Sequence, residues 1–224
     1  MKIIPSILTN NSTEAKALLS RCEDVVDRVS IDIIDGKFAD NKTIDLLALQ
    51  GIETNLKLDF QLMVIDPVNW VKKCTQAGAH LRSKTSVRRA NTIIGHIEHM
   101  TDQVEFISRV QEEGIKVGLG LDLVTPVSDL NETIINNLDM VLLMSVPAGF
   151  GGQKFSYQVI KKIKLLSNTR KKNKQKFKIH VDGGVTSDNI KDIATAGADE
   201  VSVGRSLFKG DLRENINKFN KLLS

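Results

Sequence analysis

Two aspartates belong to apolar segments, one within its segment and the other at the point where its segment gives way to a turn. Asp32 interrupts the apolar run 28–34, and Asp182 is followed directly by Gly183 and Gly184. A carboxylate in an apolar strand needs a partner or a function, because burying it alone is costly. On opposite faces of one carbon, the two carboxyls could act as acid and base and invert a centre next to a carbonyl. A structural ion pair is the alternative, and spacing alone leaves both interpretations open.

Glycines cluster at three points where backbone N–H groups could closely approach an anion. They are Gly149, Gly151 and Gly152, then Gly183 and Gly184, then Gly204, which Arg205 follows. The second and third clusters predict one phosphate held between two loops, beside the Arg205 cation and a helix N-terminus. The first cluster predicts a mobile loop that folds over a ligand. The simpler alternative is that these glycines only make tight turns.

The elements that must position these residues alternate along the chain. Strands are predicted over 3–8, 28–34, 57–63, 92–97, 116–121, 140–145, 177–181 and 200–203. Helices are predicted over 13–21, 43–49, 67–77, 101–113, 127–136, 157–173, 187–196 and 212–223. This order predicts an α/β fold, a (β/α)₈ TIM barrel formed as one domain by residues 1–224. A doubly wound sheet is the rival, but the first strand–helix turn, 9–12, has no glycine.

Composition and charge narrow the class of protein. Hydrophobic residues make up 41% and charged residues 26% of the chain, as in ordinary globular proteins. The longest apolar runs have only a few residues, so no membrane span is expected. Two cysteines and no secretory signal core favour the cytoplasm. A net charge of +4 suits an anionic small molecule. The basic stretch 170–178 belongs to no nucleic-acid module, so no nucleic-acid partner is expected.

The strand ends, taken together, resemble the ribulose-phosphate 3-epimerase family. The matching motifs are IPSIL at 4–8, IDIIDGKF at 31–38, NKTI at 41–44, DFQLM at 59–63, MSV at 144–146 with GFGGQKF at 149–155, VDGGV at 181–185 and AGAD at 196–199. The motif around 144–155 is the most specific. The resemblance runs in order over nearly the whole chain, except for residues 80–89, which look like an insertion.

The resemblance implies an isomerase of carbohydrate metabolism, in the pentose phosphate pathway, that interconverts ribulose 5-phosphate and xylulose 5-phosphate. Asp32 and Asp182 match the family's acid and base across C3 of the sugar. The positions implied to bind the phosphorylated ketose are Ser6, Met63, Met144, Gly149, Gly151, Gly152, Gly183, Gly184, Gly204 and Arg205. Barrels of this family often self-associate, which leaves a homo-oligomer open.

The chain departs from the family pattern at two of the positions that hold the family's metal ion. The family holds a divalent cation with two aspartates and two histidines, and the histidine positions fall at Ser30 and Gln61. Asp32 and Asp182 remain, so the site would offer oxygen atoms only. Such a set suits Mg²⁺ or Mn²⁺ better than Zn²⁺ and should bind weakly, which leaves either a weakly held cation or none.

Three functions therefore stay open. The first is the family's own epimerase reaction. The second is an epimerase with a different ketose-phosphate substrate, and the third is a phosphosugar-binding protein without catalysis. The loss of both histidines favours the third, and the two retained aspartates favour the first two.

Overall fold

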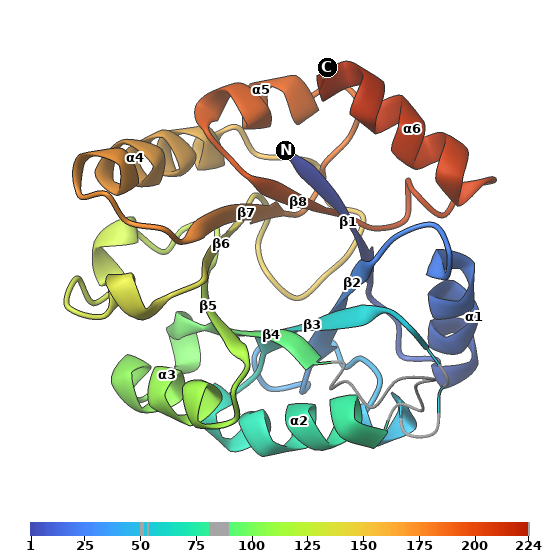
Figure 1. Ribbon diagram of the computed structural model, residues 1–224, viewed down its shortest axis with the longest axis horizontal. Coiled ribbons are helices and arrows are strands. Elements are labelled where there is room, and N and C mark those ends of the chain that lie inside the picture. Colours follow the sequence, from blue (N-terminus) through green and yellow to red (C-terminus); the bar gives the residue numbers. More distant parts are fainter. Residues whose placement is uncertain (50–51, 53, 81–89, 224) are drawn as a thin grey trace.

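Eight parallel strands close into a barrel (Figure 1). The computed structural model describes residues 1–49, 52, 54–80 and 90–223. The strands are β1 (Lys2–Ile7), β2 (Arg28–Ile34), β3 (Lys57–Met63), β4 (Ala90–His96), β5 (Lys116–Leu121), β6 (Met140–Met144), β7 (Lys178–Asp182) and β8 (Glu200–Val203). Each strand pairs with its successor, and β8 pairs with β1. The predicted (β/α)₈ barrel is confirmed, and no strand boundary differs from its prediction by more than two residues.

Helices surround the barrel on its outside (Figure 1). They are α1 (Ser12–Cys22), α2 (Val71–His80), α3 (Gln103–Glu112), α4 (Gln158–Lys172), α5 (Ile190–Ala196) and α6 (Leu212–Leu223). Within the described ranges, no helix has the length and apolar character needed to cross a membrane. Apart from His80, the segment 80–89 predicted as an insertion lies outside the described residues.

Two helix predictions are wrong. In place of helices over 43–49 and 127–136, the chain forms short 3₁₀ turns at Leu46–Leu49, Val127–Asp129 and Ile135–Asn137. The first stretch is too short for a cooperative helix to form from its own residues. The second is rich in Ser, Asp, Asn, Thr and β-branched residues, which disfavour helix.

The main apolar core lies between the strands and the helices. Val29, Ile31 and Ile33 of β2 belong to it, together with Leu19 of α1 and Ile163 of α4, and all five are buried. Side chains alternate between the two faces of a strand, so the intervening residues of β2 face the barrel interior. The outer packing therefore fixes which side chains reach the inside.

An ionic network fills the end of the barrel where the strands begin. Arg28 contacts Asp59 at 3.4 Å and also pairs with Glu200, which accepts a 2.5 Å hydrogen bond from Lys178. Burial favours the neutral form of Glu200. The hydrogen bonds from His180 and Lys178, with the charge of Arg28, nevertheless hold the pKa of Glu200 well below its usual range. This network closes the amino-terminal end and leaves the carboxyl ends of the strands, here called the mouth, for the predicted site.

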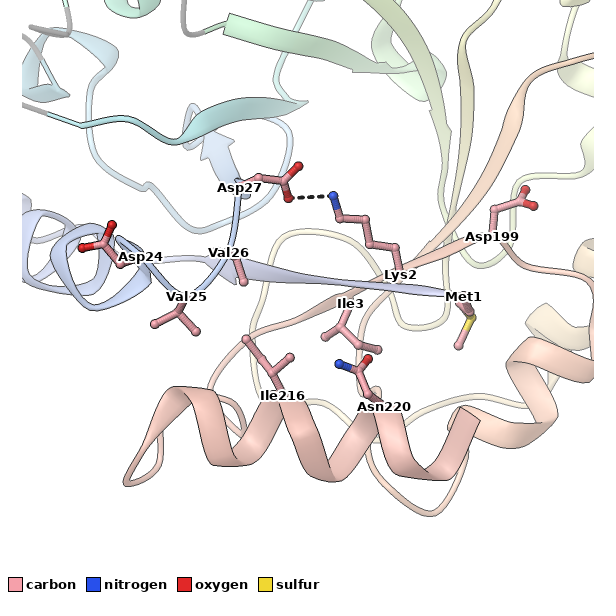
Figure 2. A pocket seen from close by; sticks show the side chains of 10 residues that line it. All are labelled: Met1, Lys2, Ile3, Asp24, Val25, Val26, Asp27, Asp199, Ile216 and Asn220. Atoms are coloured by element: carbon pink, nitrogen blue, oxygen red, sulfur yellow. Dashed lines mark hydrogen bonds and ion pairs between the residues drawn. The ribbon is translucent and has the colours of Figure 1, made fainter. Parts of the chain in front are cut away.

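A hollow of about 720 Å³ also lies at the amino-terminal end (Figure 2). Lys2 and Asp27, joined at 2.6 Å, line it together with Ile216 and Asn220 of α6. It lies at the starts of the strands, so it is separate from the site residues predicted at their ends.

Candidate active site

Two buried carboxyls occupy the barrel interior near the mouth. Asp32 is 3% exposed and Asp182, the last residue of β7, is 9% exposed. Ser6 of β1 donates a 2.9 Å hydrogen bond to Asp32 Oδ2. The structure thus brings together the two predicted catalytic residues and one predicted substrate-binding residue, from three different strands.

The burial of the two carboxyls and the charge of Asp182 change how readily they ionise. Burial raises the pKa of Asp32 well above its usual range and the charge of Asp182 raises it further, while the Ser6 hydrogen bond acts in the opposite direction. Burial also raises the pKa of Asp182, against the charge of His180 and a hydrogen bond from Gln61. Two such groups do not both ionise readily, so one can hold a proton while the other is a carboxylate. This arrangement can supply one acid and one base.

Ser30 and Gln61, the positions at which the resemblance implies histidines, also face this interior. Gln61 of β3 lies in register with Asp32 of β2, and Ser30 precedes Asp32 by two residues on the same face. Three oxygens here are buried without a hydrogen-bond partner: Ser30 Oγ, Asp32 Oδ1 and Gln61 Oε1. Buried polar atoms are rarely left unpaired, so these oxygens are free to bind another group.

These oxygens fit a hard divalent cation better than a soft one. Among the residues that the structure describes, no three His, Cys, Asp or Glu side chains gather into a metal-binding group. Two carboxylates, one amide oxygen and one hydroxyl are ligands suited to Mg²⁺ or Mn²⁺.

A second apolar cluster lies inside the barrel and forms one wall of the mouth. It contains Met63 and Met144 with Ile34, and Leu8 and Phe38 pack against it. Met63 and Met144, which the resemblance implies line the substrate, therefore belong to one cluster. They offer a largely apolar surface near the two carboxyls, in which the Met144 sulfur accepts a 3.3 Å hydrogen bond from the Gln61 amide.

The glycine loops after β6, β7 and β8 lie in direct contact with one another or with Arg205. A Cβ built at Gly151 or Gly152 would lie 3.0 or 2.8 Å from a guanidinium nitrogen of Arg205. A Cβ at Gly184 would lie 2.5 Å from the backbone nitrogen of Phe155. The approach at Gly184 requires glycine because the neighbour is backbone, and together these contacts bring a cation and backbone groups to one side of the mouth.

Contacts that sequence reasoning missed hold the loop after β6. Asn41 donates a 2.7 Å hydrogen bond to the carbonyl of Gly149, and Asp122 accepts one of 2.9 Å from the backbone of Ala148. Asp122 directly follows β5. Its position at a strand end was the feature of the sequence that could have indicated a role near the site. The loop predicted to be mobile is therefore tied to the loops after β2 and β5.

Asp35 has a structural role in the turn that follows β2. Its Oδ1 accepts hydrogen bonds from the backbones of Lys37 and Phe38, at 2.8 and 2.9 Å, and its Oδ2 accepts one of 2.9 Å from Ile65. These three bonds hold the pKa of Asp35 below its usual range despite burial. Asp35 shapes the loop after β2 and does not join the two buried carboxyls.

The chain is similar to proteins of known activity. Residues 2–208 match the ribulose-phosphate 3 epimerase family. The chain is 34% identical to ribulose-phosphate 3-epimerase of Bacillus subtilis, covering 93% of this chain and 92% of that protein. It is also 34% identical to the chloroplastic ribulose-5-phosphate-3-epimerase of Arabidopsis thaliana, over 92% of this chain and 71% of that protein. A 3-hexulose-6-phosphate synthase structure from Salmonella typhimurium shares the fold, with a TM-score of 0.66, 19% identity and coverage of 100% and 98%. The chain belongs to the ribulose-phosphate 3-epimerase family.

Proposed function

We propose that this protein interconverts ribulose 5-phosphate and xylulose 5-phosphate by proton transfer at C3. The observation that carries the proposal is the pair of buried carboxyls, Asp32 and Asp182, on strands β2 and β7 inside the barrel. Inversion at a carbon next to a carbonyl needs a base on one face and an acid on the other. A pair in which one carboxyl is protonated while the other is ionised supplies both the acid and the base at the same pH. We place the reaction in the cytoplasm, within pentose phosphate metabolism.

The mechanism follows from what each side chain can do. One of the two aspartates, as a carboxylate, removes the C3 proton, and the other, protonated, returns a proton to the opposite face. The roles reverse in the back reaction. The Ser6 hydroxyl holds Asp32 in place through its 2.9 Å hydrogen bond. Met63 and Met144 exclude water from one side of the reacting carbon.

The phosphate would lie between the glycine loops. Gly151 and Gly152, together with Gly183, Gly184 and Gly204, offer backbone close to the mouth. The guanidinium of Arg205 lies against the first two. Within the described ranges Arg205 has no ion pair or hydrogen-bond partner, so its charge is available to a phosphate.

A divalent cation would be held by Asp32, Asp182, Ser30 Oγ and Gln61 Oε1. When bound, it would act as a Lewis acid for the negative charge that develops on the substrate oxygens. Mg²⁺ and Mn²⁺ suit this donor set, because all four ligands are oxygen atoms.

A coupled assay of ribulose 5-phosphate epimerisation tests the proposal. It would be run with chelator and then with Mg²⁺, Mn²⁺ or Zn²⁺, on the wild type and on Asp32→Asn and Asp182→Asn. We expect turnover in the wild type and its loss in both variants. Absence of turnover with every metal, from folded protein that still binds the sugar phosphate, would overturn the proposal. Turnover of another ketose phosphate would then indicate a shifted substrate, and binding alone would indicate a non-catalytic protein.

A further inference from the structure

The hydroxyl of Ser145 lies among the backbone carbonyls at the end of β7. Ser145 directly follows β6 and is fully buried. Its Oγ lies 2.9 Å from the carbonyl oxygen of Asp182 and also donates to the carbonyl of Gly183. The Asp182 carbonyl already accepts a 2.7 Å hydrogen bond from the Ser145 N–H. The Gly183 carbonyl has no other donor among the residues that the structure describes, so it depends on the hydroxyl.

The position of these two carbonyls fixes the direction of the N–H groups that follow them. A trans peptide unit is planar, and its C=O and N–H point in opposite directions. Because the carbonyls of Asp182 and Gly183 are turned toward Ser145, the N–H groups of Gly183 and Gly184 point away from it. Both glycines have a positive φ, +105° and +58°, which residues with a Cβ rarely adopt. Successive N–H groups directed to one side form a concavity that binds anions.

The two N–H groups differ in what accepts their hydrogen bonds. The N–H of Gly183 donates to the Asp182 carboxyl and acts to lower its pKa. Within the described ranges of the chain, no group accepts a hydrogen bond from the N–H of Gly184. The carbonyl of Gly184 is held in turn by a 3.0 Å hydrogen bond from the side chain of Asn189. The loop is therefore fixed on both sides of one N–H that remains free for a ligand.

The surroundings of this free N–H suit a phosphate. Gly184 lies against the backbone of Phe155, in the loop that also carries Gly151 and Gly152. The guanidinium of Arg205 lies against those two glycines. Charged phosphate oxygens form strong hydrogen bonds with both guanidinium and backbone N–H donors.

We propose that Ser145 is a positioning residue that turns the Gly183–Gly184 peptide so that its N–H faces the phosphate of the substrate. The inference rests on the proposed function, because it concerns how the proposed phosphate site is built. Without the hydroxyl, nothing holds the Gly183 carbonyl on the side away from the ligand. The peptide could then turn over and present an oxygen, which repels an anion, in place of the N–H.

The first test uses the wild-type protein without a sugar substrate. Inorganic phosphate is added while ¹H–¹⁵N NMR spectra follow the assigned amide of Gly184, and calorimetry measures the affinity. We expect the amide proton of Gly184 to move downfield, because its N–H gains a charged acceptor. Phosphate binding that leaves the Gly184 amide unchanged would overturn the proposal, and so would the absence of phosphate binding.

The second test removes the hydroxyl. Ser145→Ala should weaken inorganic phosphate binding about 10-fold, the effect expected when one N–H bond to a charged group is lost, and should reduce the shift at Gly184. Ser145→Thr keeps a hydroxyl on the same carbon and should restore most of the affinity. Ser167→Ala removes another buried hydroxyl, on α4 against Gly197, and is the matched control.

The outcomes separate this inference from the proposed reaction. Equal phosphate affinity in the wild type and folded Ser145→Ala would overturn the role of Ser145, whatever the turnover. Absence of turnover by wild type whose Gly184 amide responds to phosphate would overturn the proposed reaction and leave the role of Ser145 standing. Because the first test needs no variant, a Ser145→Ala protein that fails to fold does not block it.

Discussion

Asp182, at the end of β7, acts electrostatically on Asp32 of β2 across the mouth of the barrel and raises its pKa beyond the effect of burial. An acid whose folded-state pKa is raised contributes its full stability below its unfolded pKa. That contribution is lost as the pH rises through the folded pKa. The proposed catalytic arrangement therefore costs stability at neutral pH, as reactive sites often do.

Asp32→Asn should make the protein more stable at pH 8 while abolishing turnover. The amide keeps the shape of Asp32 and can still accept the Ser6 hydrogen bond, but it carries no charge to bury. A gain on the order of 1 kcal/mol would raise the melting temperature by about 2–4 °C. Thermal unfolding at pH 4 and pH 8 checks this, since the gain should shrink at pH 4. A variant that is equally or less stable than the wild type at pH 8 would contradict the account.

Arg205→Ala should raise KM for a phosphorylated substrate about 10- to 100-fold, with a smaller effect on kcat. The guanidinium lies against Gly151 and Gly152, and a hydrogen bond to a charged group contributes about 1.5–3 kcal/mol. Lys209→Ala removes an exposed cation a few residues away and is the control. Steady-state kinetics check the difference, and added guanidinium should partly restore Arg205→Ala. Equal KM values for both variants would remove Arg205 from the phosphate site.

Gly184→Ala should disrupt the phosphate loops, whereas Gly210→Ala should not. Both glycines have a positive φ, +58° and +74°, so both substitutions share the backbone strain, roughly 1 kcal/mol. Only at Gly184 would the new Cβ meet backbone, 2.5 Å from the nitrogen of Phe155; nothing lies within 4 Å at Gly210. Inorganic phosphate binding by calorimetry should be lost in Gly184→Ala alone. Similar losses in both variants would mean that strain, and not the contact with Phe155, is responsible.

Arg28→Met should destabilise the fold by about 3–5 kcal/mol, because it leaves buried Asp59 without its cation and removes one of the two cations paired with buried Glu200. The matched change Lys2→Met breaks the exposed pair with Asp27 and should cost about 1 kcal/mol or less. Urea unfolding of both variants measures the contrast. A small effect at Arg28 would show that the network in the barrel interior does not depend on this charge.

The sequence predicted the strands well and the helices less well, for a physical reason. A strand such as β2 is an apolar run whose outward residues all pack in the core, and this pattern is visible locally. The stretch 127–136 has some helical spacing, but its residues favour turns, and the structure has only 3₁₀ turns there. In this stretch, the low helix propensity of the residues outweighed their helix-like spacing.

Sequence reasoning indicated which residues meet where they belong to strand ends, and it missed partners that come from distant parts of the chain. Asp32 and Ser6 meet because neighbouring strands bring them together. The contact between Gln61 and His96 depends on the register of β3 and β4, and nothing in the sequence near either residue indicates it. Arg28 and Glu200 are 172 positions apart in the sequence, and they meet only because the barrel closes. Their pairing therefore could not be predicted from either segment alone.

Solvent deuterium incorporation measures the central claim most directly. Ribulose 5-phosphate would be incubated in D₂O with wild type, Asp32→Asn or Asp182→Asn, and C3 of the sugar followed by NMR. The account predicts xylulose 5-phosphate with deuterium at C3 from the wild type and no inverted product from either variant. Inverted product from a variant lacking one carboxylate would contradict the mechanism based on two aspartates. Absence of inversion by folded wild type that binds the sugar phosphate would contradict the proposed activity itself.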